Sequence, residues 1–107
     1  MNNELTPYIK YYGNGNVLAK GQKNSKGQRE GLWEVFHEDG KIHWRTTFKD
    51  GKWDGIEEVF HEDGKIHWRT TFKDGKWDGI QEEFDEQGNI TETRVWKDGK
   101  LIETTKH

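Results

Sequence analysis

Apolar and polar residues alternate along most of this chain in short runs, and a glycine-containing turn separates each run from the next. Residues 32–37 and 41–48 show this alternation, which is the two-residue period of a β-strand with one buried face. Asp-Gly follows each run, at 39–40 and 50–51, and glycine accepts the positive φ that tight hairpin turns require. The pattern therefore predicts antiparallel hairpins, and no window between turns is long enough for an ordinary helix.

Strand periodicity also predicts which residues share a face, because successive side chains point to opposite sides. If residues 38–40 form a three-residue turn with Gly40 left-handed, Phe36 pairs with Ile42. One face is then apolar, and we expect it to hold Leu32, Phe36, Ile42, Trp44, Phe48, Ile56, Phe60, Ile66, Trp68, Phe72, Ile80, Phe84, Ile90 and Trp96. The opposite face is mostly polar and is expected to hold His43, Arg45, Thr47, Glu57, Val59 and His61. Trp53 and Ile56 are three residues apart, so a bulge or bend at Asp54-Gly55 must reset the alternation.

The hairpins are copies of one another. Residues 34–56 and 58–80 are identical, and weaker copies flank them at the same offset of 24 residues. The self-similarity gives four units at about 8–31, 32–55, 56–79 and 80–103, with the divergent ones at the ends, as in repeat arrays. Residues 1–7 are expected to form a flexible leader before a single repeat domain at 8–107. The predicted fold is all-β, with tandem hairpin repeats of about 24 residues that form an elongated, twisted antiparallel meander sheet.

Composition limits both the core and the partners. Only 29% of the residues are hydrophobic and 35% are charged, which argues against a compact globular core. Six Trp, five Phe and three Tyr still support a thin aromatic core, because each ring buries a large apolar area. A net charge of -3 gives no electrostatic case for nucleic acid or an anionic membrane. The first residues hold no apolar run long enough for a signal peptide or a membrane span, so a cytoplasmic location is expected.

The histidines and carboxylates of this chain do not predict a catalytic or metal site, although such residues form these sites in other proteins. His37 and His43 share a face of one hairpin, and the duplication repeats them as His61 and His67, but a zinc site needs three or four convergent ligands. We expect solvated cross-strand pairs instead. The carboxylates lack the pocket that would separate their pKa values for acid–base work, and cysteine is absent. The sequence therefore predicts no catalytic residue, no metal and no cofactor.

The units share a Gly-Ile start, a phenylalanine three or four residues later, Asp-Gly-Lys, an aromatic strand and Lys-Asp-Gly-Lys-Trp-Asp-Gly. This pattern resembles the MORN-repeat variant of bacteria and covers nearly the whole chain, from residue 8 to residue 103. The resemblance implies hairpins in an elongated sheet. It also implies a role as an antitoxin of a toxin–antitoxin system, of the YwqK type, or as an immunity protein that accompanies a toxin.

The duplication favours a binding surface over an active site, because any site within one copy is present twice on one surface. The leading hypothesis is a non-enzymatic protein that binds a cognate toxin and covers its active surface. Acidic residues would meet basic groups of the toxin, and tryptophans, if exposed, would anchor it. The candidate partner-binding residues are Trp33, Arg45, Trp53, Glu57, Glu58, His61, Arg69, Trp77, Gln81, Glu82, Glu83 and Asp85.

Two other functions stay open at this point. A structural scaffold would self-associate through its sheet edge or its aromatic face and form a homo-oligomer. A carbohydrate-binding module would present exposed tryptophans as stacking platforms. Neither alternative requires a membrane, a nucleic acid or a cofactor.

Overall fold

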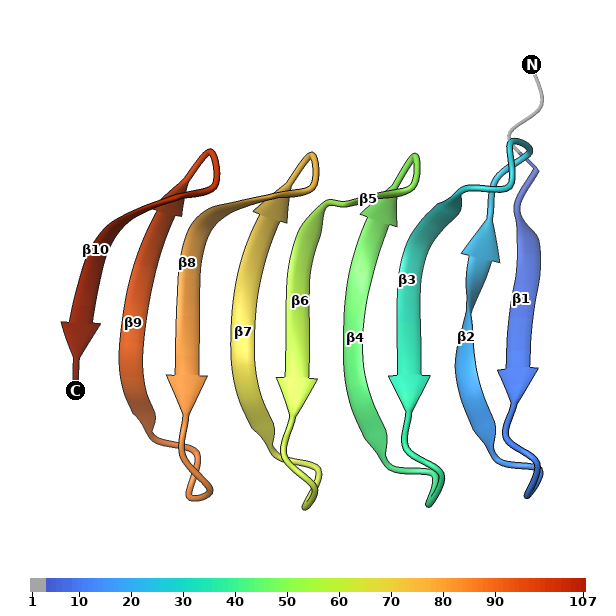
Figure 1. Cartoon of the computed structure of the whole chain (residues 1–107), viewed down its shortest axis with the longest axis horizontal. Helices are drawn as coiled ribbons and strands as arrows, with labels where there is room; N and C mark the ends of the chain where they lie inside the picture. Colours follow the sequence, from blue (N-terminus) through green and yellow to red (C-terminus); the bar gives the residue numbers. More distant parts are fainter. Residues whose placement is uncertain (1–3) are drawn as a thin grey trace.

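The computed structural model describes residues 4–107 and contains one antiparallel sheet of ten strands. The order of the strands in the sheet follows the chain, and the short strand β5 pairs with β4 beside this path (Figure 1). The described residues contain no helix, and hence none long and apolar enough to cross a membrane. The strands are β1 (Thr6–Tyr11), β2 (Val17–Lys23), β3 (Arg29–Phe36), β4 (Ile42–Lys49), β5 (Lys52–Trp53), β6 (Gly55–Phe60), β7 (Ile66–Lys73), β8 (Lys76–Phe84), β9 (Ile90–Lys97) and β10 (Lys100–Lys106).

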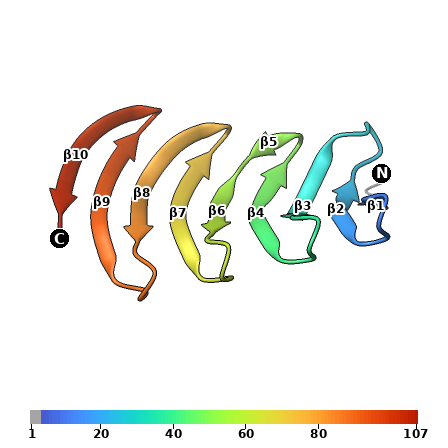
Figure 2. The same ribbon diagram turned by 60° about the horizontal axis from the view of Figure 1, so that its bottom comes forward.

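The sheet is a single open layer, which confirms the predicted all-β meander of hairpin repeats. Figure 1 shows the strands side by side with β1 and β10 at opposite edges, and Figure 2 shows that the strands are bowed. The Cα atoms extend over 44 × 37 × 15 Å. Because no second layer covers either face, a side chain is buried only by neighbours on its own face.

The turns at the two ends of the sheet have different geometries. Asp50, Asp74 and Asp98 have φ of 50–51°, and the glycine after each has φ of 81–82°. Two left-handed residues in succession form the two-residue hairpin turn that the Asp-Gly pairs predict. All three of these glycines donate their N–H groups to carbonyls of the preceding unit, at 2.8–3.0 Å, so neighbouring units hold the turns in place. At the other end of the sheet Gly40 has φ of 90°, which confirms the predicted left-handed residue.

One face, called the aromatic face below, contains most of the core. A chain of ring contacts crosses it, with successive centroids 4.2–6.4 Å apart. Trp33 is the most deeply buried of these rings, with 2% of its surface exposed. Edge-on and tilted ring pairs of this kind stabilise a core beyond the area that they bury. The rings in the chain are Tyr8, Trp33, Phe48, Trp53, Phe72, Trp77 and Trp96.

The predicted distribution of residues between the two faces is wrong in part. The register pairs Leu32 with Thr47 and Trp33 with Thr46, so Leu32 points away from the buried tryptophan. Leu32, Ile56 and Ile80 lie on the opposite face and are exposed. Phe36, Phe60 and Phe84 also lie there, beneath the cationic groups of Lys20, Arg45 and Arg69 at 5.3–5.7 Å. Conversely, Glu57 and Val59 lie on the aromatic face, paired with Thr70 and Trp68.

The wrong assignment of faces has a physical cause, which is a register shift that the residue types do not predict. It falls between Val35 and Phe36, and again at the equivalent places in β6 and β8. The extra residue of each bulge lies in the partner strand, at His43 of β4, His67 of β7 and Thr91 of β9, and it reverses the alternation within that strand. A bend does lie at Asp54-Gly55, where β5 has ended and Gly55 has φ of 112°, but the predicted reset of the alternation is wrong. The bend leaves Trp53 and Ile56 on opposite faces.

The start of the sheet overlaps the expected leader of residues 1–7. Thr6 and Pro7 belong to β1 and pair with Lys23 and Gln22 of β2. Residues 1–3 lie outside the described residues. The four expected units correspond to the hairpins β1–β2, β3–β4, β6–β7 and β8–β9, and β10 pairs with β9 after the last of them.

Candidate protein-binding surface

The face opposite the aromatic core carries alternating charges and is called the charged face below. Arg45 Nε lies 2.9 Å from a carboxylate oxygen of Glu58. Arg69 lies 3.5 Å from Glu58 and 3.6 Å from Glu82. Glu34 begins the same cross-strand line, opposite Arg45. In the hairpins β3–β4 and β6–β7 the acid lies on the first strand and the arginine on the second, and Glu82 follows on β8, so the sign of the charge changes from strand to strand.

An exposed apolar row crosses the charged face beside these ion pairs. Leu32, Ile56 and Ile80 occupy equivalent places in three successive units and are 53%, 49% and 52% exposed. Neighbouring strands of a sheet are about 4.8 Å apart, and each hairpin contributes two strands, so these side chains recur about every 10 Å. Their cross-strand partners fill the intervening places in the row, and these are Thr47, Thr71 and Val95.

A second line of charges flanks the apolar row on its other side. Side chains two residues apart on a strand share a face, so the residues two before and two after each apolar residue belong to the charged face. On the acidic strands the added residues are Glu30, Asp54 and Asp78, and on the basic strands they are Lys49, Lys73 and Lys97. Each apolar residue therefore lies between two acids, one before it and one after it along the chain, and bases occupy the strands between.

A recess lies at the β1 end of the apolar row. It has a volume of about 460 Å³ and is lined in part by Pro7, Ile9, Lys20 and Leu32. Ile9 is 49% exposed and lies opposite Lys20 in the pairing of β1 with β2. The recess therefore extends the apolar row by one more side chain and has room for a bulky apolar group.

The two predicted histidine pairs stack across their hairpins. The ring centroids are 4.4 Å apart for His37 and His43, and 4.1 Å apart for His61 and His67. All four rings are half-buried rather than fully solvated. Burial, and in second place the neighbouring His37, lowers the pKa of His43. Within residues 4–107, no three His, Cys, Asp or Glu side chains gather closely enough to hold a metal ion.

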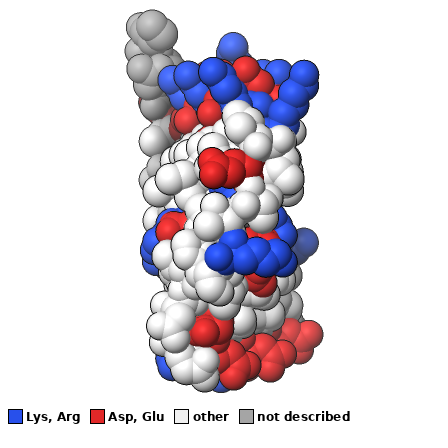
Figure 3. All heavy atoms as spheres, turned by 90° about the vertical axis from the view of Figure 1, so that its left-hand side faces the viewer, with Lys and Arg blue, Asp and Glu red and all other residues white. Residues whose placement is uncertain are grey.

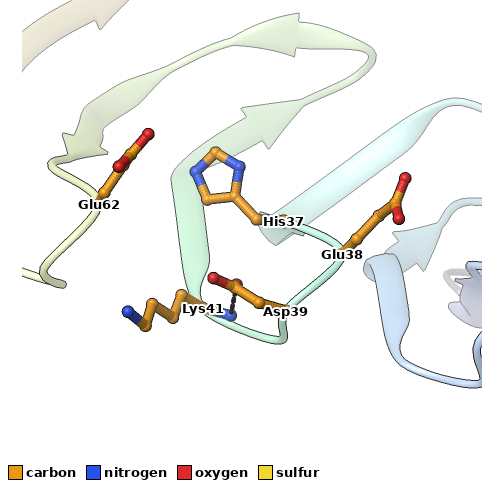
Figure 4. A pocket seen from close by; sticks show the side chains of 5 residues that line it. All are labelled: His37, Glu38, Asp39, Lys41 and Glu62. Atoms are coloured by element: carbon orange, nitrogen blue, oxygen red, sulfur yellow. Dashed lines mark hydrogen bonds between the residues drawn. The ribbon is translucent and has the colours of Figure 1, made fainter.

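A shallow pocket of about 360 Å³ opens beside His37. Figure 4 shows that Glu38, Asp39 and Lys41 come from the turn between β3 and β4, whereas Glu62 comes from the next turn along the sheet. The carboxylate of Asp39 accepts the backbone N–H of Lys41 at 2.9 Å, and the lysine side chain points away from the imidazole. The pocket therefore presents no assembled set of catalytic groups.

Charge is also separated between the two ends of the sheet. The turns at one end carry Lys-Asp-Gly-Lys, at 49–52, 73–76 and 97–100. Turns at the other end carry Glu-Asp-Gly-Lys, at 38–41 and 62–65. Figure 3, which looks at the β10 edge, shows Lys and Arg gathered at one end and again at mid-height, and Asp and Glu gathered at the other end. The net charge of -3 therefore describes neither end of the molecule.

The candidate residues proposed from the sequence do not form one surface. Arg45, Glu58, Arg69 and Glu82 lie together on the charged face. Their sequence neighbours Glu57, Gln81 and Glu83 lie on the aromatic face, opposite Thr70 and Trp68 in the register. The candidate acids are therefore divided between the two faces, because adjacent residues on a strand point to opposite sides.

The other candidates differ in accessibility. Trp33 is buried and cannot serve as a surface anchor, whereas Trp53 and Trp77 are 38% and 36% exposed on the aromatic face. His61 lies with its Nε2 3.2 Å from the carbonyl oxygen of Phe84 in the next unit. The carboxylate of Asp85 accepts backbone N–H groups of its own turn, chiefly that of Asn89, and these bonds lower its pKa. Gln81 is buried as well, which removes it from any contact surface.

Sequence reasoning missed the apolar row because it assigned those residues to the core. The signal that identifies the row is the adjacency of Leu32 and Trp33. Neighbours on a strand cannot both be buried in a single-layer sheet, and tryptophan has more apolar surface to bury than leucine. The exposed residue is therefore Leu32, and the repeat extends this conclusion to Ile56 and Ile80.

The fold and this surface define a single-layer β-hairpin repeat protein of the interaction type. A family model described as the MORN repeat variant matches residues 29–50, 53–74 and 77–98. These segments make up more than half of the chain, and the protein belongs to the MORN-repeat variant family. MORN repeats are generally non-catalytic modules that interact with proteins or membranes. No curated protein and no solved structure matches the chain.

Proposed function

We propose that this protein is a non-enzymatic module that binds another protein through its charged face, with the apolar row of Leu32, Ile56 and Ile80 at the centre of the contact. The proposal rests on one observation: in three successive units the apolar residue at the equivalent position is about half exposed. The aromatic core lies on the other face and gains nothing from these residues. Contiguous exposed apolar residues rimmed by polar ones mark interaction sites.

The charges beside the row support recognition of a particular partner. Ion pairs at 2.9–3.6 Å fix Arg45, Glu58 and Arg69 in a regular pattern. A fixed pattern of charge sets the orientation and the rate of association more than the final affinity. The apolar row therefore supplies affinity in this proposal, and the charges select the partner.

We further propose that the partner is a toxin, and that the chain acts in the cytoplasm as an antitoxin or immunity protein. This part rests on the resemblance to the bacterial MORN-repeat variant and on the breadth of the surface, which suits occlusion of another protein's active surface. In the revised mechanism Glu58 and Glu82 contribute to the contact. Glu57 and Glu83 do not, because they belong to the other face.

The test compares three baits in an affinity capture from the cell of origin. The baits are the wild-type chain, the Ile56→Asp/Ile80→Asp double variant, and Leu101→Asp as a control at an exposed apolar residue outside the row. We expect one protein to be recovered with the wild-type and control baits and lost with the double variant. Equal recovery with all three baits would rule out the apolar row as the contact.

A growth assay tests the toxin part separately. The captured protein, expressed alone, should arrest growth, and co-expression of the wild-type chain should restore it. The double variant should fail to restore growth although it folds, which far-ultraviolet circular dichroism checks. A captured protein that is harmless when expressed alone would contradict the antitoxin role and leave the binding role intact.

A further inference from the structure

We propose that the segment bound on the charged face is a basic amphipathic α-helix that lies across the strands. Its apolar residues recur at every seventh position, and Lys or Arg flanks each of them. This inference rests on the proposed function, because it defines the class of segment that the partner presents.

The spacing of the apolar row is the first argument. Leu32, Ile56 and Ile80 recur about every 9.6 Å, which is twice the distance between neighbouring strands. Seven residues of an α-helix span about 10.5 Å, so residues seven apart meet successive members of the row. The mismatch accumulated from Leu32 to Ile80 is about 2 Å, which side-chain rotation absorbs. An extended strand presents a side chain to one face about every 6.7 Å and does not match.

The sign of the charges is the second argument. Ile56 lies between Glu58 of its own strand and Asp54, which comes directly before that strand, and Leu32 and Ile80 lie between equivalent pairs of acids. On a helix, the residues immediately before and after an apolar contact residue point to its two sides at nearly the same height. These two positions meet the acids, so the pattern selects Lys or Arg there. Half a heptad later the helix passes Arg45 or its equivalent, and acidic residues fit best.

The same arrangement argues against a second copy of the chain on this face. All three members of the apolar row lie on acidic strands. If two copies are aligned with apolar row against apolar row, the acids flanking each row face one another across the interface. Like charges in contact across an interface disfavour association. The surface therefore fits a partner in which apolar residues have basic neighbours, which this chain itself does not offer at the row.

The recess beside Ile9 and Leu32 adds an end point to the contact. It lies where the row reaches β1, and its volume of about 460 Å³ accommodates a bulky side chain. The cation of Lys20 lies at its border, 3.8 Å from Glu34. The helix therefore fits best with a large apolar residue, such as phenylalanine, in the heptad that reaches β1.

The test uses designed peptides of four heptads as probes. The first peptide has Leu at each contact position, Lys immediately before and after it, and Glu half a heptad later. A second peptide of the same composition exchanges Lys and Glu, and a third is a proline-rich peptide with Leu at every third residue. Binding to the full chain is measured by fluorescence anisotropy at two salt concentrations. We expect the first peptide to bind at least about tenfold more tightly than the second, and more so at low salt.

Chain variants complete the test. Ile56→Asp/Ile80→Asp should abolish binding of the first peptide, and Leu101→Asp should leave it unchanged. Glu34→Lys/Glu58→Lys/Glu82→Lys should reverse the preference between the first two peptides. Equal binding of the two peptides, or tighter binding of the proline-rich peptide, would overturn the inference. If the captured native partner still requires the apolar row while no peptide prefers the predicted charge pattern, the proposed function stands and the helical inference fails.

Discussion

The contact between Gly21 and Trp33 makes the sharpest prediction about stability. Gly21 lies in β2 on the aromatic face, directly beneath the indole ring of Trp33. A Cβ atom at position 21 would lie 2.3 Å from two atoms of the ring, whereas ordinary contacts begin near 3.4 Å. The backbone at Gly21 does not have a positive φ, so the cost of a substitution comes from this contact alone. We therefore expect Gly21→Ala to destabilise the sheet.

The magnitude follows from how tightly the ring is held. The indole must move by about 1 Å, but two neighbours restrict this movement. The ring centroid of Tyr8 lies 5.2 Å from that of Trp33, and Cζ of Arg29 lies 4.8 Å from the Trp33 centroid. The indole Nε1–H donates to the carbonyl oxygen of Gln22 at 2.9 Å, and a shift weakens this bond. Overpacking lowers the free energy of unfolding by about 1–3 kcal/mol, and a lost hydrogen bond lowers it by about 1 kcal/mol. Alanine also reduces the conformational entropy of the unfolded chain, which raises the free energy of unfolding by about 0.5 kcal/mol. We expect a net loss of about 2–3 kcal/mol, or about 10–15 °C in Tm.

Urea unfolding followed by tryptophan fluorescence measures this loss. Gly13→Ala is the matched control, because no atom lies within 4 Å of a Cβ there. Adding Trp33→Leu to Gly21→Ala should cost less than the sum of the two single changes, since the smaller side chain relieves the contact. If Gly21→Ala stays within about 0.5 kcal/mol of the wild type, the close packing of Trp33 on the backbone is refuted.

Three further predictions concern turns, ion pairs and pH. Gly79 has φ of 110°, and a Cβ atom there would lie 3.2 Å from the side chain of a threonine. Gly64 has φ of 90°, and a Cβ atom there would meet open space. Gly79→Ala should therefore lower the urea midpoint more than Gly64→Ala. Glu58→Gln should cost less than about 1 kcal/mol, because the arginines around it are more than one third exposed, and added salt should shrink the difference. The pKa of His43 is lowered by burial and by a neighbouring histidine, so the unfolded chain binds this proton more readily and stability falls as pH drops below 6.5. His43→Asn should remove the part of the stability loss that His43 causes, which urea midpoints measured between roughly pH 8 and pH 5 would show.

The hairpins were predictable because their signals are local. Asp-Gly fixes where each turn falls, and the identical copies fix the period, so strand order and class follow from the sequence. The faces were only partly predictable. The bulge adds His43 to β4, contains no glycine and places Ile42 and Trp44 on opposite faces of the sheet. The same shift recurs in the next two hairpins, and it appears only in the pairing of two strands and not in the residue types of either one.

The candidate surface was predictable to the same extent. The sequence singles out Glu58 and Arg69 as candidate residues, but their position opposite one another follows from the register of β6 with β7. Glu57 was grouped with Glu58 because the two are adjacent, although they point to opposite faces. The sequence pattern therefore identified the charged residue types, while the assignment of each one to a surface required the three-dimensional register.

The position of Glu57 leads to a last prediction, because the next unit holds a glutamine at the equivalent place. Gln81 donates its side-chain N–H to the hydroxyl of Thr70 at 3.3 Å. One unit earlier, the register of β4 with β6 places Glu57 beside Thr46, which is 1% exposed. The hydroxyl of Thr46 has no hydrogen-bond partner among the described residues. An ionised glutamate cannot donate to that hydroxyl, and burial raises the pKa of Glu57 above its usual 4.5.

Glu57→Gln should therefore stabilise the sheet at neutral pH. The amide carries no charge to desolvate and can donate to Thr46 as Gln81 does to Thr70, for a gain of about 1 kcal/mol. Because the folded chain holds the proton of Glu57 more tightly than the unfolded chain, the wild type itself gains stability as pH falls toward 4.5. The advantage of the variant should therefore be largest near pH 8 and shrink on acidification, which urea unfolding over roughly pH 8 to pH 5 measures. Glu62→Gln, in an exposed turn, is the control and should show no such trend. This prediction is refuted if Glu57→Gln is no more stable than the wild type at pH 8, or if its advantage grows as pH falls. Either result would mean that the ionised Glu57 carboxylate on the aromatic face does not destabilise the sheet.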